Sequence, residues 1–495
     1  MPTRRCLVTG ATGYIGGRLV PELLASGYQV RVMVRHPERV RDHPWFDQVE
    51  VAVADASDSD AVAQAMKGID VAYYLMHSLG SGDDFEQTEE RIARSFTEAA
   101  AREGVDRIIY LGGLSHDSDL SAHMRSRNTV GRILLAGSVP TIALRAAVII
   151  GSGSLSFEMV RYLTERLPAM VTPKWVNTRT QPIAIRDVLR YLVACAGLDE
   201  SLNRSFDIGG PDVLTYEEMM QGYAKVAGLH KRIIVTIPVL TPRLSSRWVG
   251  VVTPLPAAVA RPLVDSLRNE SVCAEHDIVD YVPDPPEGLL GYRRSVELAL
   301  ERIKDAKVST RWSQASVAGV PSDPLPTDPD WAGGSLYTDV RETVVDATPA
   351  QLWSVIEGVG GENGWYSFPM GWEIRGWVDR AVGGVGLRRG RRDPRHLMVG
   401  ETVDFWRVEE RIPGSLLRLR AEMRLPGLAW LELSVGADES GRTLYRQRAI
   451  FHPRGLAGHA YWRSISPFHG LVFGSMLRNI ASSARGARLD QSEIA

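Results

Sequence analysis

Short apolar runs alternate with helical patterns over the first 225 residues of the chain. The runs are rich in β-branched residues, and the segments between them carry apolar residues at helical spacing. This alternation is typical of βαβ units that form a parallel sheet. The predicted strands are residues 6–9, 29–34, 49–54, 71–75, 107–111 and 141–149, with helices such as 17–26 and 85–103 between them.

The pattern changes after residue 225 and again after residue 310. Residues 226–310 are irregular and contain several prolines, with one helical segment near 295–303. We predict that this segment forms a small substrate lobe that completes the first unit. A polar, proline-rich stretch within residues 311–335 predicts a linker.

Residues 336–485 have a different character again. A strand is predicted at 336–345 and a helix at 348–359, with Pro349 in the first turn of that helix. Four strand-like stretches follow, and then a last helical segment that Pro467 is expected to interrupt: 401–411, 416–425, 429–435, 443–452 and 459–483. This order predicts an antiparallel sheet curled around a helix, which is an α+β arrangement.

Composition and charge exclude several classes of protein. A chain of 495 residues is long enough for two or three domains. Lys plus Arg is 57 and Asp plus Glu is 59, and this balance carries no signature of nucleic-acid binding. The three cysteines, Cys6, Cys195 and Cys273, lie far apart, which predicts no disulfide framework and no metal site.

The compartment is expected to be the cytoplasm. Widely spaced cysteines fit a reducing environment. The N-terminus passes directly into a predicted strand, unlike a signal peptide. The most apolar later stretch, residues 248–267, is interrupted by prolines and an arginine, which argues against a membrane span.

A glycine-rich loop joins the first predicted strand to the first predicted helix. Gly10 allows a tight turn, Gly13 lets the backbone approach a pyrophosphate, and Gly16 allows close contact between helix and sheet. The helix N-terminus supplies unpaired N–H groups and a positive dipole end for the anion. The loop therefore predicts a dinucleotide site, in preference to a purely structural turn, formed by Gly10, Thr12, Gly13, Tyr14, Ile15 and Gly16.

The Gly-x-x-Gly-x-x-Gly spacing, with Thr9 before it, resembles the short-chain dehydrogenase/reductase superfamily. Over about residues 1–300 the chain is most similar to the atypical, NmrA-like branch, whose members bind NAD(P) but often lack the catalytic residues. The resemblance implies a Rossmann domain of α/β class in residues 1–225, with a doubly wound parallel sheet.

In this superfamily, the residue that ends the second strand selects the cofactor. An acidic residue accepts hydrogen bonds from the ribose 2′-hydroxyl of NAD, whereas a basic residue pairs with the 2′-phosphate of NADP. Arg35 follows the second predicted strand, and no acid stands at the end of that strand. We therefore expect NADP in preference to NAD, the alternative being that Arg35 is a solvated loop residue.

The resemblance also implies further cofactor contacts. It places Asp55 at the adenine, although Asp55 is equally suited to cap the helix that follows. Met76 and His77 are placed at the nicotinamide ribose, the alternative for His77 being a partly buried histidine without chemistry. Arg145 lies in the sixth predicted strand, before a loop that contacts the nicotinamide side in related proteins.

The usual catalytic pair of the superfamily is missing. Its reductases use a tyrosine and a lysine four residues later on a helix, where the lysine lowers the tyrosine pKa. None of the six lysines in this chain follows a tyrosine at that spacing. His123 and Arg127 stand at the expected location. Either His123 transfers protons near pH 7 and Arg127 contacts a ribose, or both are surface residues of an inactive site. Ser115 either matches the substrate-polarising serine or only begins a polar turn.

Residues 336–485 resemble the START-like or polyketide-cyclase-like helix-grip fold, and in particular an uncharacterised domain that follows an NmrA-like Rossmann domain in some bacterial proteins. The matching stretches include 364–366, 375–379, 383–392, 404–408, 421–427 and 467–469. Related domains enclose an apolar cavity for lipids, polyketides or similar molecules. Eight of the 12 tryptophans lie from residue 331 onward and either line such a cavity or pack in the core. Glu422 and Glu432 either face inward as acid/base groups or pair with Arg420 or Arg424.

These observations favour an NADP-dependent oxidoreductase that acts on a small apolar or aromatic molecule, held with the help of the C-terminal domain. Two alternatives stay open. Because the tyrosine–lysine pair is absent, the protein is alternatively a non-catalytic, NADP-responsive sensor. It is otherwise a lipid-binding or small-molecule-binding protein whose Rossmann domain is structural.

Overall fold

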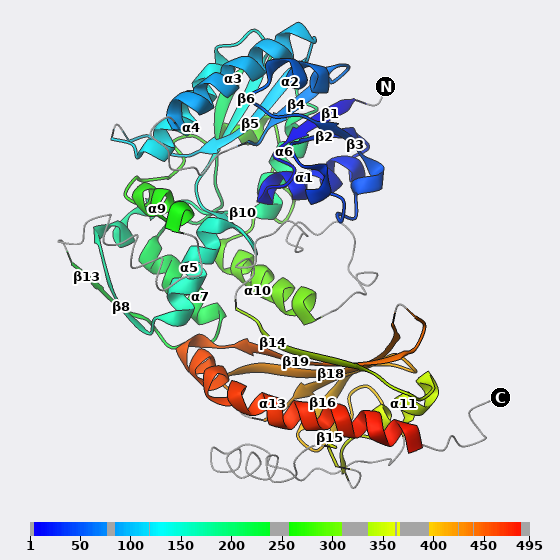
Figure 1. Ribbon diagram of the computed structural model, residues 1–495. Coiled ribbons are helices and arrows are strands. Elements are labelled where there is room, and N and C mark those ends of the chain that lie inside the picture. Colours follow the sequence, from blue (N-terminus) through cyan, green and yellow to red (C-terminus); the bar gives the residue numbers. More distant parts are fainter. Residues whose placement is uncertain are drawn as a thin grey trace. The chain divides into compact units, whose positions relative to one another are not determined.

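Two units make up the chain in the computed structural model (Figure 1). They comprise Met1–Gly334 and Ser335–Ala495. The structure describes residues 4–76, 85–117, 119–237, 257–308, 335–361, 364–366, 396–423, 425–438 and 440–486. The linker predicted at 311–335 lies outside these ranges except for Ser335.

A parallel sheet forms the centre of the first unit (Figure 1). Its seven strands lie in the order β11-β6-β5-β4-β1-β2-β3, and every neighbouring pair is parallel. The predicted Rossmann-type sheet is thereby confirmed. The strands are β1 (Arg5–Thr9), β2 (Gln29–Val34), β3 (Glu50–Val53), β4 (Val71–Tyr74), β5 (Arg107–Gly113), β6 (Thr141–Ala146) and β11 (Arg204–Ile208).

Helices cover both faces of this sheet. Successive residues of a strand point to opposite sides, so each face of the sheet contributes to its own core. Val8 and Val32 are buried in one core cluster, and Leu7 and Met33 are buried in another. The sheet is therefore doubly wound. The first cluster includes residues of α1 (Tyr14–Ala25) and α6 (Ile185–Cys195), and the second includes residues of α2 (Ser59–Met66), α3 (Phe85–Arg102) and α4 (Ala122–Leu135).

Two strand predictions are wrong, because residues 401–411 form two strands, β15 (Thr402–Val403) and β16 (Trp406–Ile412), and residues 141–149 are divided as well. Residues 141–149 do not form a single strand, because β6 ends at Ala146 and the chain leaves the sheet there. The next two apolar residues form β7 (Ile149–Ile150), which pairs with β10 (Ile183–Ala184) in a separate two-stranded sheet. Between β6 and β7, Ala147 and Val148 line the pocket described below.

The small lobe draws on more of the chain than residues 226–310. Its core combines buried residues from 148–176, 216–223 and 264–299, so segments on both sides of β11 build it. The sequence pattern missed this because the lobe is assembled from insertions after β6 and β11. Its elements are α5 (Leu155–Arg166), β8 (Ala169–Thr172), β9 (Arg179–Thr180), β12 (Leu214–Thr215), α7 (Tyr216–Val226), β13 (Ile233–Thr236), α9 (Ala257–Ser266) and α10 (Tyr292–Val308). Short 3-10 helices of the first unit are η1 (Pro37–Arg39), η2 (Phe46–Gln48), η3 (Lys174–Asn177) and η4 (Asp277–Asp280).

The second unit is built on an antiparallel sheet, as predicted. Its six strands lie in the order β14-β19-β18-β17-β16-β15. Two helices pack against the sheet, and the core between them includes Leu352, Leu431 and Met476. The elements are β14 (Tyr337–Val344), α11 (Pro349–Glu357), β15 (Thr402–Val403), β16 (Trp406–Ile412), β17 (Leu416–Ala421), β18 (Gly427–Ala437), β19 (Thr443–Pro453) and α13 (Gly455–Gly486).

Two helices begin with capping boxes. Thr215 and Glu218 form a capping box at the start of α7, and Thr348 and Gln351 form another before Pro349 in α11. The predicted interruption at Pro467 is wrong, because α13 continues through this residue. Proline removes one backbone donor, and the Ser466 hydroxyl donates to the carbonyl of Arg463 at 3.4 Å in that turn.

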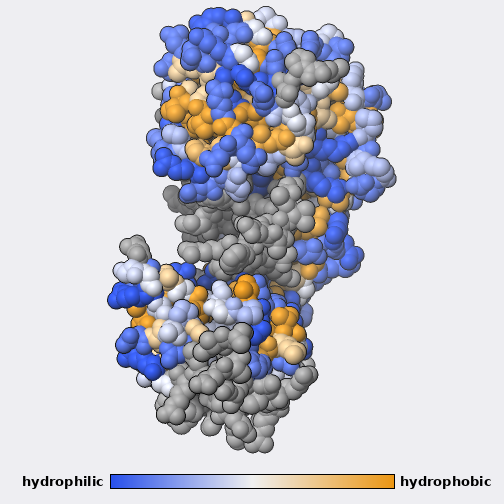
Figure 2. Space-filling model, turned by 90° about the vertical axis from the view of Figure 1, so that its right-hand side faces the viewer, coloured by the Kyte–Doolittle hydropathy of each residue, from blue (hydrophilic) through white to orange (hydrophobic). Residues whose placement is uncertain are grey.

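Hydrophilic and hydrophobic areas are interleaved on the face shown in Figure 2. Within the part of the chain that the structure describes, none of the helices combines the length and the apolar character needed to cross a membrane.

Candidate functional site

The glycine loop between β1 and α1 is tightly packed. Gly10 has a positive φ of 69°, and a Cβ atom there would lie 2.6 Å from the carbonyl oxygen of Leu75. A Cβ atom at Gly16 would lie 2.3 Å from the carbonyl oxygen of Gly10. The Gly13 amide donates to that same oxygen at 2.9 Å. Two of the three glycines are therefore required by close backbone contacts.

The start of α1 is suited to an anion. Its N-cap residue is Gly13, which has no side chain to cap the helix, and no acidic residue lies in the first turn. The first N–H groups of a helix have no partner within the helix, and they carry the positive end of the helix dipole. Gly13 is exposed, and Thr12, Tyr14 and Ile15 are partly exposed. A phosphate group fits this N-terminus.

Arg35 and Asp55 lie together at the ends of neighbouring strands, β2 and β3. Arg35 Nη1 lies 3.9 Å from Asp55 Oδ2, and both side chains are exposed. Asp55 accepts hydrogen bonds from the Ser57 hydroxyl at 2.6 Å and the Ser57 amide at 2.8 Å, and these bonds lower the pKa of Asp55. Asp55 does not cap α2, because that role belongs to Asp58, which accepts from the amides of Asp60 and Ala61.

The other predicted cofactor contacts are spread more widely. Met76 follows β4 and packs against the core next to α2 and α3. His77 lies outside the described residues. Arg145 on β6 directs its Nε to Asp207 at 2.7 Å and its Nη2 to Glu275 at 3.6 Å, and it is not part of the pocket lining. The structure thus places Arg145 in an ion-pair network within the first unit.

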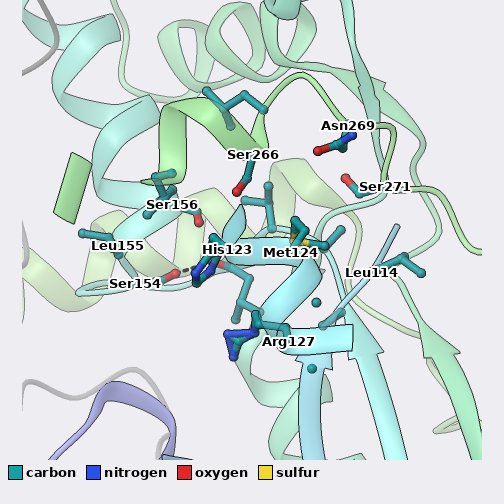
Figure 3. A pocket seen from close by; sticks show the side chains of 18 of the residues that line it. Leu114, His123, Met124, Arg127, Ser154, Leu155, Ser156, Ser266, Asn269 and Ser271 are labelled. Atoms are coloured by element: carbon teal, nitrogen blue, oxygen red, sulfur yellow. Dashed lines mark hydrogen bonds between the residues drawn. The ribbon is translucent and has the colours of Figure 1, made fainter. Parts of the chain in front are cut away.

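A cavity of about 270 Å³ lies between the start of α1, the ends of β5 and β6, the first turns of α4, and the small lobe. Tyr14 and Ile15 of the glycine loop and helix contribute to it. His123 and Arg127 enter it from α4 (Figure 3). The structure therefore brings the predicted nucleotide loop and the predicted histidine–arginine pair to one pocket.

Local geometry places His123 and Arg127 on one face of α4. Ser121 caps this helix by accepting from the Met124 amide at 3.3 Å, and residues four apart share a face. Arg127 Nη2 donates to the carbonyl of Leu111 on β5 at 3.4 Å. The hydroxyl of Tyr110 donates to the Arg127 carbonyl at 3.0 Å. These contacts attach the first half of α4 to the end of β5.

His123 is neutral at pH 7. Burial and the nearby positive charge of Arg127 both disfavour the imidazolium form, and together they lower the pKa of His123 to about 3. A neutral imidazole has no imidazolium proton to give near pH 7. This is at odds with the interpretation of His123 as a proton donor at that pH. His123 is partly exposed and is part of the pocket lining.

Ser115 begins a polar turn and does not line the pocket. It is buried, and its hydroxyl accepts from the Asp117 amide at 3.3 Å. His116 next to it contacts Asp207, with 2.8 Å between Nε2 and Oδ2. The geometry matches the alternative interpretation of Ser115 as a turn residue.

The opposite wall of the pocket was not predicted from the sequence. Its polar residues are Ser154, Ser156, Ser266, Asn269 and Ser271, which come from two separate segments of the small lobe (Figure 3). No local motif marks them, because only the packing of the lobe brings these segments together.

Asn269 attaches the lobe to the loop before α4. Its Nδ2 donates to Asp117 Oδ2 at 3.0 Å and to the Asp119 carbonyl at 2.8 Å, and its Oδ1 accepts from the Ser121 amide at 3.2 Å. The Ser121 and Ser266 hydroxyls lie 3.0 Å apart. This side chain therefore fixes one wall of the pocket against the N-cap of α4.

In the second unit, Glu422 and Glu432 are both paired with arginines. Glu432 is buried and contacts Arg418 Nε at 2.9 Å and Arg448 Nε at 3.1 Å, and Glu422 contacts Arg407 Nε at 2.5 Å. One of the two alternatives from the sequence was a pair with Arg420 or Arg424. Arg420 instead lies 3.9 Å from Glu409, and Arg424 is outside the described residues.

The tryptophans of the second unit that the structure describes serve mainly in packing. Trp353, Trp365 and Trp406 are buried in its core, and Trp430 is buried as well. Trp462 stacks on Tyr337, with the ring centroids 5.1 Å apart and the planes within 6° of parallel. Aromatic packing therefore supplies much of the core of this unit.

Two family models match the chain. Residues 10–161 match a family described as NAD(P)H-binding, and residues 331–476 match a family described as protein of unknown function (DUF2867). The first unit thus contains a Rossmann-type sheet in a region that matches an NAD(P)H-binding family, and a region that matches DUF2867 follows it.

Several curated proteins and solved structures are similar to parts of the chain. Ceramide reductase of Caulobacter vibrioides is 28% identical over 232 residues, which are 46% of this chain and 72% of that protein. A 3 beta-hydroxysteroid dehydrogenase/Delta 5-->4-isomerase of Mycobacterium tuberculosis is 35% identical over 116 residues, which are 21% of this chain and 30% of that protein. The structure of Citrobacter sp. triphenylmethane reductase complexed with NADP(H) is 19% identical, with a TM-score of 0.48, and the match covers 60% of this chain and 99% of that one.

Proposed function

We propose that this protein is an NADP(H)-dependent oxidoreductase that acts on a small apolar or aromatic molecule. One observation carries the proposal: the uncapped N-terminus of α1 and the His123–Arg127 pair open into the same pocket. A dinucleotide bound at the glycine loop would thus extend toward the pocket through Tyr14 and Ile15, which belong to both features.

The residues of the loop fit the dinucleotide. Side chains at Gly10 and Gly16 would clash with neighbouring backbone atoms, and Gly13 has no side chain that would keep a phosphate away from the start of α1. The amides in the first turn of α1 are available to that phosphate. When bound, the nicotinamide supplies or accepts a hydride. The chain's own residues line part of the pocket with apolar side chains and place the positive charge of Arg127 in it.

A preference for NADP is supported by Arg35. Its guanidinium is exposed at the end of β2, where the 2′-substituent of the ribose is expected. Asp55 lies beside it and accepts a hydrogen bond from the Ser57 hydroxyl. No acid at the end of β2 competes for the ribose hydroxyl.

An apolar substrate is supported by the pocket and by the relatives. Leu114, Leu155 and Leu267 are among its lining residues. The names of two relatives refer to a ceramide and to a hydroxysteroid, which are largely apolar molecules. We include in the proposal that the second unit helps to hold such a molecule, as START-like helix-grip domains do. This part of the proposal is supported by the architecture of the second unit, in which two helices pack on an antiparallel sheet and the core between them contains several aromatic residues.

Calorimetry with NADPH and NADH tests the cofactor. The purified protein is expected to bind NADPH more tightly than NADH, and Arg35→Glu is expected to remove that preference. Arg132→Glu is the matched control, because Arg132 is exposed on α4 and its Nη2 donates to the hydroxyl of Thr129, one turn away on the same helix. Absence of binding by either dinucleotide contradicts the proposal and favours a small-molecule-binding protein with a structural Rossmann domain.

A non-catalytic sensor is the second candidate, and the neutral state of His123 together with the missing tyrosine–lysine pair supports it. The two candidates differ in their response to substitution. If cellular function survives His123→Ala but is lost in Arg35→Glu, sensing is favoured over catalysis. Mass spectrometry of molecules retained during gentle purification would identify ligands of both units.

A further inference from the structure

The charge in the pocket is of one sign. Among the described lining residues, Arg127 is the one ionised side chain, and there is no aspartate, glutamate or lysine. Arg127 makes no salt bridge within the described part of the chain: Nη2 contacts the Leu111 carbonyl at 3.4 Å, and the buried Nε has no hydrogen-bond partner. A partly buried guanidinium with only a weak neutral partner favours an anion beside it.

Apolar side chains lie beside this charge, next to the polar wall from the small lobe, and the pocket has enough space for fused rings. Leu114, Met124, Leu155, Leu263 and Leu267 are among the lining residues. The cavity of about 270 Å³ is larger than the cavity of about 150 Å³ that is known to hold benzene. A low-dielectric wall strengthens the attraction between Arg127 and a negative charge.

We propose that this pocket binds apolar, conjugated molecules that carry a delocalised oxyanion, a phenolate or an enolate, with Arg127 against the oxygen and His123 as a hydrogen-bonding neighbour. A localised, fully hydrated anion such as a carboxylate on a polar molecule loses more hydration energy beside the apolar side chains of this pocket. Phenolates and enolates spread their charge into a ring or a double bond, so they lose less hydration energy on entry.

The substrate class that follows from this site is that of α,β-unsaturated ketones and quinones. This part of the inference rests on the proposed function, because reduction of such molecules requires NADPH. Hydride addition from NADPH to the β-carbon of an enone moves the electron pair of the C=C bond onto the carbonyl oxygen. The enolate that forms is stabilised by Arg127, and water later supplies a proton to the α-carbon. NADPH is oxidised to NADP⁺, and the C=C bond is reduced.

An isolated ketone suits the site less well. Hydride addition to its carbonyl carbon gives a localised alkoxide, which is far more basic than an enolate and requires a proton donor at the moment of transfer. Arg127 does not deprotonate in proteins, and His123 is held neutral at pH 7. No lysine among the described lining residues is available to lower the pKa of Tyr14 or Tyr216, and burial raises the pKa of Tyr216.

Binding of 2-naphthol tests the oxyanion site without cofactor or turnover. The neutral and ionised forms of this molecule have different absorption spectra, so an absorption titration measures the pKa of the bound molecule directly. We expect the wild-type protein to lower that pKa by about 1–3 units relative to free 2-naphthol, as a nearby positive charge does. Failure to bind 2-naphthol, or binding with an unchanged pKa, overturns the proposal.

Substitutions of two arginines on α4 separate the pocket charge from charge elsewhere. Arg127→Met is expected to remove the pKa shift, and Arg127→Lys to retain part of it. Arg125→Gln is the control, because Arg125 is exposed and bonds to the Leu120 carbonyl and Glu86 outside the pocket. If Arg127→Met unfolds the protein, the partial shift in Arg127→Lys still tests the assignment. An equal shift in wild type and in a folded Arg127→Met variant contradicts it.

A second experiment tests the substrate class by comparing the turnover, with NADPH, of two ketones that have the same carbon skeleton. Benzylideneacetone is expected to be reduced at its C=C bond at least tenfold faster than 4-phenylbutan-2-one is reduced to its alcohol. Equal rates, or alcohol formation from both, overturn the substrate class. If NADPH does not bind while the 2-naphthol shift is present, the proposed function fails and the oxyanion site stands.

Discussion

The imidazole of His123 and the guanidinium of Arg127 lie one helical turn apart on α4 and line the same pocket. The positive charge of Arg127 adds to the effect of burial and keeps His123 neutral at pH 7. The pair therefore combines a permanent cation with a neutral hydrogen-bonding ring. Such a pair stabilises negative charge but supplies no imidazolium proton.

Replacement of His123 by asparagine is expected to make folding less sensitive to mild acid. The pKa of His123 falls from 6.5 to about 3 on folding, so between these values the unfolded chain binds a proton that the folded protein does not. The free energy of unfolding therefore decreases as the pH falls through this window. Urea unfolding at pH 7.5 and pH 5 should show that wild type loses about 1–2 kcal/mol more than His123→Asn.

The control for this prediction is His36→Asn, since His36 is exposed in η1's N-cap position. This variant is expected to lose as much stability between the two pH values as wild type. Equal losses in all three proteins would contradict the proton linkage at His123.

Substitution of Gly16 by alanine is expected to weaken dinucleotide binding at least tenfold and to destabilise the first unit by about 1–3 kcal/mol. The added Cβ would lie 2.3 Å from the Gly10 carbonyl oxygen, so either α1 or the loop has to move. Calorimetric titration and thermal unfolding measure the two effects. Gly197→Ala is the control, because its Cβ would meet the nearest atom at an ordinary contact distance of 3.6 Å. If Gly16→Ala bound the dinucleotide as tightly as wild type, binding would not depend on the close contact between Gly16 and the Gly10 carbonyl.

Replacement of Glu432 by glutamine is expected to lower the free energy of unfolding of the second unit by about 3 kcal/mol. Glu432 is buried between Arg418 and Arg448, and the substitution leaves the buried cationic charge without this counterion. Glu342→Gln on β14 is the matched control, since its bond to Arg446, at 2.9 Å, is exposed and should contribute less than about 1 kcal/mol. Similar losses in urea unfolding for both variants would argue against a special role of burial.

Substitution of Pro467 by alanine is expected to raise the free energy of unfolding by about 1–3 kcal/mol, because proline is far less favourable than alanine inside a helix. Pro467 is exposed, so alanine leaves no cavity in the core. Ser466→Ala is expected to lower the stability only when residue 467 is proline. Proline has no backbone N–H, so the Ser466 hydroxyl then donates to the Arg463 carbonyl without competition from the amide of residue 467. Thermal unfolding of the two single variants and the double variant measures this coupling, and strictly additive effects would contradict it.

Local sequence signals were sufficient for most elements of both units. β2 agrees with its prediction at both ends, and the capping box of Thr215 and Glu218 forms as its spacing indicates. These features depend on side-chain periodicity and on hydrogen bonds within four residues. Local signals failed where longer contacts compete. The apolar run 141–149 is divided between two sheets, and α2 is capped by Asp58 instead of the equally suitable Asp55.

The sequence by itself determined the nucleotide loop, because Gly10, Gly13 and Gly16 act within one strand–turn–helix, and it determined the absence of a tyrosine–lysine pair. Only the tertiary structure decided the rest of the site. Ser154 and Asn269 are more than 100 residues apart in the chain and meet at one pocket only after the small lobe has packed. The protonation state of His123 was likewise undecided by residue type, since it depends on how far the ring is removed from water and on the charge that lies beside it.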